Sequence, residues 1–143
     1  MKKLLFTFIA LSCGYLSQSQ ELGLRFGDVT GGNIGIDGVF STSEFSRVHG
    51  TVSFGGNNLG IDLLWDFAYR DLGDTPLNWY AGVGPSFLLG DPLVVSAMGE
   101  LGLEYRFRDA PISLSGDWRP TVTLVPTTNA FYGSYGLNLR YIF

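Results

Sequence analysis

Apolar and polar residues alternate along most of the chain after residue 20. The clearest stretch runs from Leu59 to Arg70, where apolar or aromatic residues fill every odd position and Asp62 and Asp66 lie at even ones. Alternation with a period of two is typical of a β-strand with two different faces. The pattern predicts eight strands, over approximately residues 21–29, 34–43, 46–55, 59–70, 77–89, 93–107, 111–124 and 130–143.

The predicted strands are joined by short segments rich in Gly, Asn, Asp and Pro, such as residues 30–33, 55–58 and 90–92. These residue types favour tight turns, and short hairpins in series form an up-and-down antiparallel meander. Pro85 and Pro120 lie inside the fifth and seventh predicted strands, where proline cannot donate to a β-ladder. We therefore expect a bulge or an early strand end at both prolines.

The face that points inward separates a soluble barrel from a transmembrane one, because only the transmembrane barrel has an apolar exterior. An eight-stranded interior is just wide enough for side chains, and the apolar faces here are too wide and too aromatic to fit it. The pattern predicts an all-β fold, an up-and-down antiparallel transmembrane β-barrel of eight strands with a polar, filled lumen. Aromatic residues that fall at one expected rim agree with an interfacial girdle: Phe40, Trp65, Phe67, Tyr69, Trp79, Tyr80, Tyr105, Phe107, Tyr141 and Phe143.

The N-terminal residues predict export. Met1-Lys2-Lys3 is a short basic segment, residues 4–11 form an apolar run too short to span a bilayer, and Ser17-Gln18-Ser19 offers small residues for cleavage. We interpret residues 1–19 as an export signal peptide and residues 20–143 as the barrel domain. Cys13 follows Ala10-Leu11-Ser12, which loosely resembles a lipoprotein signal, so lipidation of Cys13 stays open. Cleavage after Ser19 would leave no thiol for a disulfide or a metal.

The charge balance of the chain disfavours nucleic acid as a partner. Both lysines lie in the predicted signal, so the remaining chain has seven arginines against thirteen acidic residues. Nucleic-acid binding needs a basic patch, and this balance argues against such a partner.

Inward positions of the predicted strands carry equal numbers of acidic and basic residues. Charges in a narrow lumen are costly unless they are paired, so we expect an ionic network that fills the core and gives the protein a structural or membrane-integrity role. A narrow porin-like channel lined by the same groups is the alternative. The predicted network comprises Asp37, Asp62, Asp66, Glu100, Glu104 and Asp117 with Arg25, Arg47, Arg70, Arg106, Arg119 and Arg140.

One pair within this network follows from the expected strand register. A hairpin around residues 108–110 pairs the sixth and seventh strands so that opposite inward positions sum to 219. Glu100 then lies opposite Arg119, close enough for a direct ion pair.

Catalytic and metal-binding groups are sparse. The single histidine, His49, lies on the polar face of its strand beside Thr51 and Ser53, and we interpret it as a hydrogen-bonded member of the interior. A lipid A modifying enzyme, which would pair His with Ser and an acidic residue, is the third reading. We predict no enzyme activity, no catalytic or metal residues and no cofactor, because one His without Cys forms no ligand cluster of familiar spacing.

The final strand, Gly136 to Phe143, ends on alternating apolar positions and an aromatic residue. Together with the predicted signal and the eight segments, it resembles the small outer-membrane β-barrel family of Gram-negative bacteria. The stretches 99–107 and 117–120 are similar to segments of uncharacterised members. The resemblance implies an outer-membrane location, contact with outer-membrane lipid, a monomer, and insertion by the barrel assembly machinery. Tyr141 and Phe143 would then form the assembly signal.

Overall fold

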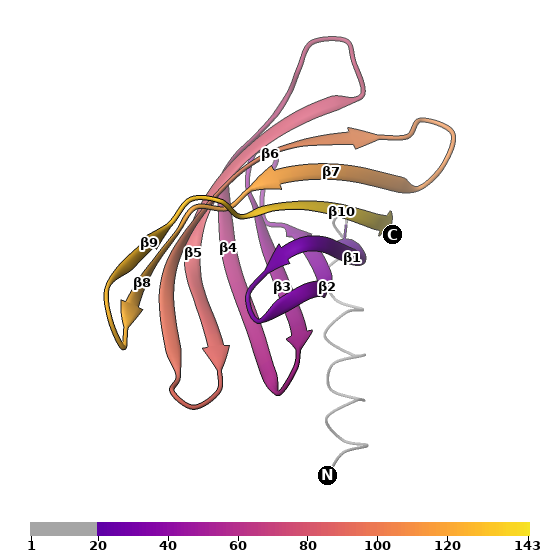
Figure 1. The fold of residues 1–143 in the computed structure, drawn as a ribbon. Coiled ribbons are helices and arrows are strands. Elements are labelled where there is room, and N and C mark those ends of the chain that lie inside the picture. Colours follow the sequence, from indigo (N-terminus) through magenta and orange to yellow (C-terminus); the bar gives the residue numbers. More distant parts are fainter. Residues whose placement is uncertain (1–19) are drawn as a thin grey trace.

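A computed structural model describes residues 20–143, and the predicted signal peptide with Cys13 lies outside these residues. The described chain is built of antiparallel strands, and it has no helix long and apolar enough to cross a membrane. The strands, with the labels of Figure 1, are β1 (Gln20–Val29), β2 (Gly32–Ser41), β3 (Arg47–Gly55), β4 (Asn58–Asp71), β5 (Leu77–Leu89), β6 (Val94–Arg106), β7 (Ile112–Trp118), β8 (Thr121–Val125), β9 (Asn129–Phe131) and β10 (Tyr135–Ile142).

These strands close into an eight-stranded up-and-down barrel. Each of β1 to β6 pairs with its neighbour in the chain, β7 pairs with β6 and β10, and β10 returns to pair with β1. The short strands β8 and β9 continue the seventh and start the eighth strand of this meander. The predicted fold class, a closed all-β meander, is confirmed, and the eight predicted segments correspond to the strands observed.

The two prolines behave differently from each other. At Pro120 the seventh strand breaks into β7 and β8, and the chain continues with β8 still paired to β6. The break is bridged by two backbone hydrogen bonds, from Gly99 N to Pro120 O at 2.8 Å and from Arg119 N to Ser134 O at 2.9 Å. The expectation of a strand end near Arg119 is confirmed. Pro85, by contrast, stays inside a continuous β5 opposite Ala97 without a register shift, so the expectation of a bulge or strand end at Pro85 is wrong.

The barrel wall has two halves that close in different ways (Figure 1). In what we call the closed half, β10 pairs with β7 on one side and with β1 on the other, from Ile142 opposite Glu21 as far as Gly136 opposite Gly27. In the open half, β9 pairs only with β8 among the described strands. The β8–β9 hairpin therefore leaves the ring, and a seam separates β9 from the turn between β1 and β2.

The two faces of the sheet are inverted relative to a water-soluble barrel. Among the described residues, the buried hydrophobic side chains are Val39, Leu64, Tyr80 and Met98, whereas twenty-one polar or charged residues are buried. Large apolar side chains cover the exterior, and leucines of the closed half such as Leu103 and Leu139 keep about half of their surface exposed. The predicted polar, filled interior is confirmed.

Eight of the ten aromatic residues in the predicted girdle face outward, and two tyrosines do not. Its other members lie on the exterior, where Trp65–Phe67, Tyr105–Phe107 and Tyr141–Phe143 form edge-to-face pairs. Tyr80 is fully buried, because it neighbours Trp79 in β5 and adjacent strand residues face opposite sides. Tyr69 also turns inward, since the β4–β5 ladder shifts register between Asp66 and Ala68 and reverses the facing beyond that point.

Candidate functional site: the ionic interior

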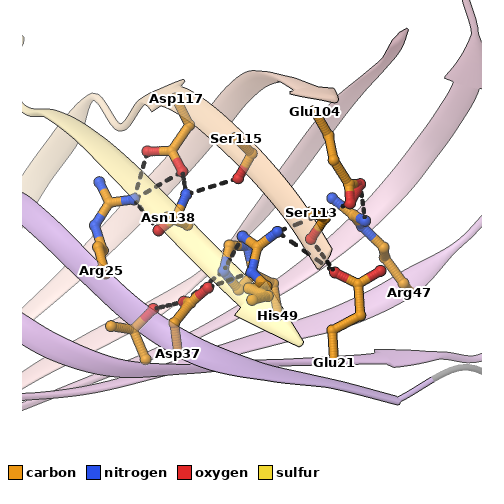
Figure 2. A network of polar contacts seen from close by, with 12 residues as sticks. Glu21, Arg25, Asp37, Arg47, His49, Glu104, Ser113, Ser115, Asp117 and Asn138 are labelled. Atoms are coloured by element: carbon orange, nitrogen blue, oxygen red, sulfur yellow. Dashed lines mark hydrogen bonds and ion pairs between the residues drawn. The ribbon is translucent and has the colours of Figure 1, made fainter. Parts of the chain in front are cut away.

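The charged side chains of seven strands meet in the barrel interior. Figure 2 shows part of this network. Eleven of the twelve predicted network members lie there: Asp37, Asp62, Asp66, Glu100, Glu104, Asp117, Arg25, Arg47, Arg106, Arg119 and Arg140. All but Arg106 are buried, and the guanidinium of Arg106 keeps partial contact with solvent at the rim. Alternation of side chains along each strand brings these groups together, because residues two apart share one face.

His49 lies at the centre of the network between two carboxylates. Its Nε2 is 2.6 Å from Asp37 Oδ1, and its Nδ1 is 2.7 Å from Glu100 Oε1. An ionised carboxylate accepts hydrogen bonds and cannot donate them, so this geometry requires a proton on both ring nitrogens. His49 therefore acts as a second kind of cation beside the arginines of the described core, and the prediction of a hydrogen-bonded histidine is confirmed.

Two arginines extend this cluster on either side of His49. Arg119 Nε donates to Glu100 Oε2 at 2.6 Å, and Arg140 Nε donates to Asp37 Oδ2 at 2.5 Å. Positive and negative groups thus alternate from Arg140 through Asp37, His49 and Glu100 to Arg119. The β6–β7 register, in which Gly102 opposes Asp117 and Leu101 opposes Trp118, has the predicted sum of 219. The predicted Glu100–Arg119 ion pair is confirmed.

A second cluster closes the interior toward the rim of the closed half. Arg47 donates to Asp66 Oδ2 and to Glu104 Oε2, both at 2.8 Å. Its guanidinium carbon lies 4.3 Å from the ring centroid of Tyr69 and 4.5 Å from that of Tyr80, which are cation–π distances. Arg47 is thus held by two charges and two rings.

Two further pairings complete this end of the network. Arg106 donates to Glu21 at the rim, and Ser113 donates to the other Glu21 oxygen at 3.2 Å. Because Glu21 is buried with two donors, it belongs to the network although it was not among the predicted members. Its position in the alternation could have identified it, since Glu21 shares a face with Arg25 in β1.

A third cluster joins β1, β7 and β10. Arg25 Nη1 donates to Asp117 Oδ2 at 2.7 Å and to Asn138 Oδ1 at 3.1 Å. Asn138 Nδ2 in turn donates to Asp117 at 2.8 Å and to Ser115 at 3.0 Å, and the Tyr80 hydroxyl donates to Asp117 at 3.1 Å. Tyr80 and Asn138 are network members that the sequence-based charge count missed, because neither side chain is charged.

The prediction that Arg70 belongs to the network is wrong. Arg70 is exposed, its Nη1 donates to the backbone oxygen of Tyr69 at 3.1 Å, and its guanidinium lies 4.0 Å from the Phe45 ring centroid. The register shift between Asp66 and Ala68 explains the error, since it turns Tyr69 inward and Arg70 outward. A bulge of this kind breaks the strict alternation on which the prediction rested.

The centre of the network contains a trio that resembles a metal site. Ligand atoms of His49, Asp66 and Glu100 lie within 4.8 Å of one another, and all three residues are buried. A metal-bound histidine needs a nitrogen free of its proton, whereas both nitrogens of His49 already face carboxylates and Arg119 and Arg140 approach the ring at 3.2 Å. These guanidinium charges oppose a divalent cation, so the arrangement does not fit a metal.

The same geometry bears on nucleophilic catalysis. A histidine that activates a serine must lie within hydrogen-bond reach of the hydroxyl, and the close partners of the His49 nitrogens, at 2.6 and 2.7 Å, are the carboxylates of Asp37 and Glu100. The nearby Thr51 hydroxyl donates to Asp37 at 2.8 Å and accepts from Arg119 at 3.1 Å. The arrangement therefore favours a fixed charge network over an activated nucleophile.

The charged clusters separate two cavities at opposite ends of the barrel. One, of about 200 Å³, lies at the rim of the closed half among Ser41, Ser46, Arg47, Tyr69 and Arg106. The other, of about 270 Å³, lies in the open half and reaches Asp62 and Arg119 at its inner end. His49, with none of its surface exposed, lies in the packed region between them.

Comparison with protein-family models, with curated proteins and with solved structures finds no match for this chain.

Proposed function

We propose that the chain is an integral outer-membrane β-barrel of a Gram-negative bacterium, a monomer with a structural or membrane-integrity role and a lumen closed by its ionic network. The observation that carries this proposal is the inverted facing of the sheet, with charged residues buried inside and large apolar residues exposed outside. The alternating apolar exterior and polar interior are typical of transmembrane barrels.

The exterior supports this proposal energetically. Burying one large apolar side chain away from water is worth about 1.5–3 kcal/mol, and contiguous apolar patches of this kind mark surfaces that meet a partner or a membrane. Leucines, isoleucines and phenylalanines, together with Trp65, are exposed on strands all around the barrel. Lipid is the partner that covers such a belt on every side. In the closed half, a hydrogen-bonded ring also satisfies the backbone groups that lipid cannot.

Fluorescence quenching by brominated lipids tests the location of this belt. Trp65, Trp79 and Trp118 all lie on the outer face, and Trp65 is 55% exposed. If the protein folds in vesicles with these rings in lipid, bromine on the acyl chains quenches their emission while aqueous iodide does not. Unbrominated vesicles are the control. Folding without lipid or detergent, with emission quenched by iodide alone, would contradict the proposal.

The interior supports a closed barrel over a channel. The buried chain of charges from Arg140 to Arg119 lies between the two end cavities. An eight-stranded lumen is normally filled by its side chains. We therefore expect no steady ion current from the refolded protein in a planar bilayer. A reproducible conductance would instead favour the narrow porin-like channel.

Insertion by the assembly machinery is tested at the last strand. Tyr141 and Phe143 are exposed, and their rings pack edge to face at 5.0 Å. Phe143→Ser removes one rim side chain, so it should leave refolding in detergent intact but lower the amount of protein in the outer membrane of cells. Leu72→Ser, also exposed at the same rim, is the matched control. Normal cellular levels of the Phe143 variant would exclude Phe143 from an assembly signal.

A further inference from the structure

The cavity of the open half differs chemically from the rest of the interior. Its lining has two acidic residues, Asp28 and Asp62, and one basic residue, Arg119. The remaining polar lining consists of hydroxyl groups from strands on several sides: Thr30, Ser86, Ser96, Thr121, Thr123 and Ser134. Hydroxyl groups, together with apolar side chains such as Leu88, Val94 and Met98, thus replace the paired charges that fill the closed half.

One carboxylate oxygen of Asp62, at the inner end of this cavity, has an ion pair with Arg119 but no hydrogen bond. The residue is 1% exposed, and its Oδ1 accepts hydrogen bonds from Thr30 and Ser86, both at 2.6 Å. Its Oδ2 has no hydrogen-bond partner within the described chain, and the nearest cation, Arg119 Nη1, is 3.5 Å away. A buried carboxylate oxygen without a donor is costly, so a donor from a bound molecule would stabilise it.

The seam between the two hairpins gives this cavity a side entrance. Where the β1–β10 pairing ends, Asp28 accepts two hydrogen bonds, from Tyr135 N at the start of β10 at 3.2 Å and from Ser134 Oγ at 3.4 Å. Beyond them, Val29 and Thr30 line the cavity from one side of the seam and Phe131 lines it from the other. The Phe131 ring is 57% exposed and stands at this entrance.

The lining indicates the chemical class of the ligand. A cation would meet the guanidinium of Arg119, which already lies beside Asp62, and an anion would meet two carboxylates. Hydroxyl groups donate and accept hydrogen bonds equally well, so they suit a neutral ligand that does the same. The volume of about 270 Å³ is close to the lower end of the range for small-molecule pockets, about 300 Å³.

We propose that this cavity binds the ring of a sugar or a similar polyhydroxylated group, with a ligand hydroxyl donating to Asp62 Oδ2 and the others meeting the hydroxyl-lined wall. Phe131 packs on the apolar face of the ring. The sugar is either free in solution or the head group of a lipid. Entry of a lipid-borne sugar through the seam rests on the proposed membrane location, whereas binding of a free sugar rests on the fold alone.

The proposed membrane location also fixes the level of the seam. The paired stretch of β1 from Glu21 to Gly27 rises about 20 Å along the strand at about 3.3 Å per residue. With a strand tilt of about 40°, this is roughly 15 Å of an apolar band about 25 Å tall. The seam therefore begins about 10 Å below the outer edge of the band and extends from there toward the lipid head groups.

The first test uses protein refolded in a zwitterionic detergent and titrated calorimetrically with methyl β-glucoside and methyl β-galactoside. We expect saturable binding of at least one of the two. Asp62→Asn should weaken it about tenfold, and Thr123→Val, which removes one lining hydroxyl, about threefold. The matched control is Asp109→Asn on the exposed turn at the opposite rim, which should bind as the wild type does. Thermal unfolding and the β-sheet circular dichroism signal identify any variant that fails to fold.

The second test separates the two sources of the sugar. In lipid nanodiscs, the affinity for the free methyl glycoside is compared between discs of phosphatidylcholine alone and discs that also contain monoglucosyl or monogalactosyl diacylglycerol. Weaker apparent affinity in the glycolipid discs shows that the lipid head group occupies the cavity, and equal affinity assigns the site to free sugar. Absence of saturable binding in detergent and in every disc would overturn the proposal. Binding that neither Asp62→Asn nor Thr123→Val changes would also overturn it.

Discussion

The closed and open halves of the barrel are built from the same alternating strands but solve the problem of a polar interior differently. In the closed half, every wall strand is paired on both sides, and fully buried ion pairs fill the space. In the open half, the β8–β9 hairpin leaves the ring, and hydroxyl groups line a cavity instead. Dense ion pairing thus coincides with complete closure.

The local cause of this difference is the segment between β7 and β8. The N–H of Arg119 donates to Ser134 O, which extends the β7–β10 register by one residue. Pro120 has no N–H and cannot continue this ladder. The eighth strand of the meander is interrupted opposite this break, between Phe131 and Tyr135. Its first part, β9, therefore stays paired with β8 and does not pair with β1. A single break in the seventh strand therefore opens the wall of one half, while the side chain of Arg119 still anchors the network of the other half through Glu100.

The largest expected effect is loss of one partner from the Glu100–Arg119 pair. Both side chains are buried and 2.6 Å apart, and Glu100 also faces His49. Removing one member of a buried pair leaves an uncompensated charge and typically costs about 3–5 kcal/mol. We expect Glu100→Gln and Arg119→Met each to lower the free energy of unfolding in this range, measured by urea unfolding in lipid vesicles.

The double variant Glu100→Gln, Arg119→Met measures the coupling of this pair. Each single variant leaves one buried charge without its partner, whereas the double variant removes both charges. The double variant should therefore lower the free energy of unfolding by less than the sum of the two single losses. Asp109→Asn, on the exposed turn at the opposite rim, is a control that should be additive with Arg119→Met. Zero coupling between Glu100 and Arg119 would show that the two residues belong to separate networks.

A charge placed on the outer face should have the next largest effect. Its stability cost should differ between the closed half and the open half. Leu139 faces outward in the middle of β10 and lies opposite Leu24 and Leu114 in the complete ring. Leu139→Arg should cost about 2–4 kcal/mol if it lies near the bilayer midplane. Leu124→Arg in β8 is equally exposed but lies near the opposite rim, so it should cost less. Equal losses of refolded fraction in vesicles would contradict the proposed position of the lipid belt.

The sequence predicts most of this architecture because alternation is a local property. Strand positions, the inward face and the Glu100–Arg119 register all follow from residues two apart and one hairpin. The bulge between Asp66 and Ala68 could not be predicted in this way, since no residue there marks an extra position in the strand. Uncharged members such as Asn138 were missed because their role depends on cross-strand partners. The hydroxyl-lined cavity was missed because it arises where the β8–β9 hairpin leaves the ring.

A smaller effect is expected at Tyr80, which connects two clusters of the closed half. Its hydroxyl donates to Asp117 at 3.1 Å while its ring lies against the Arg47 guanidinium. Tyr80→Phe keeps the ring and removes the hydrogen bond, so it should cost about 1 kcal/mol. Tyr80→Leu also removes the cation–π contact and should cost more. Urea unfolding in vesicles measures both, and a Tyr80→Phe variant as stable as the wild type would show that Asp117 is fully satisfied by Arg25 and Asn138.

The smallest effect is expected at Arg70, and it tests the bulge directly. The Arg70 guanidinium contacts the exposed Phe45 ring and a backbone oxygen, and it pairs with no acidic side chain of the described chain. Exposed cation–π contacts are worth about 0.5–1 kcal/mol, so Arg70→Gln should lower the free energy of unfolding by no more than this. Arg106→Gln is the matched comparison, because Arg106 is nearby at the same rim but pairs with the buried Glu21. It should cost clearly more than Arg70→Gln in the same urea titration. If the two variants lost equal stability, Arg70 would have to face the interior, and strict alternation would continue through Ala68 without the register shift.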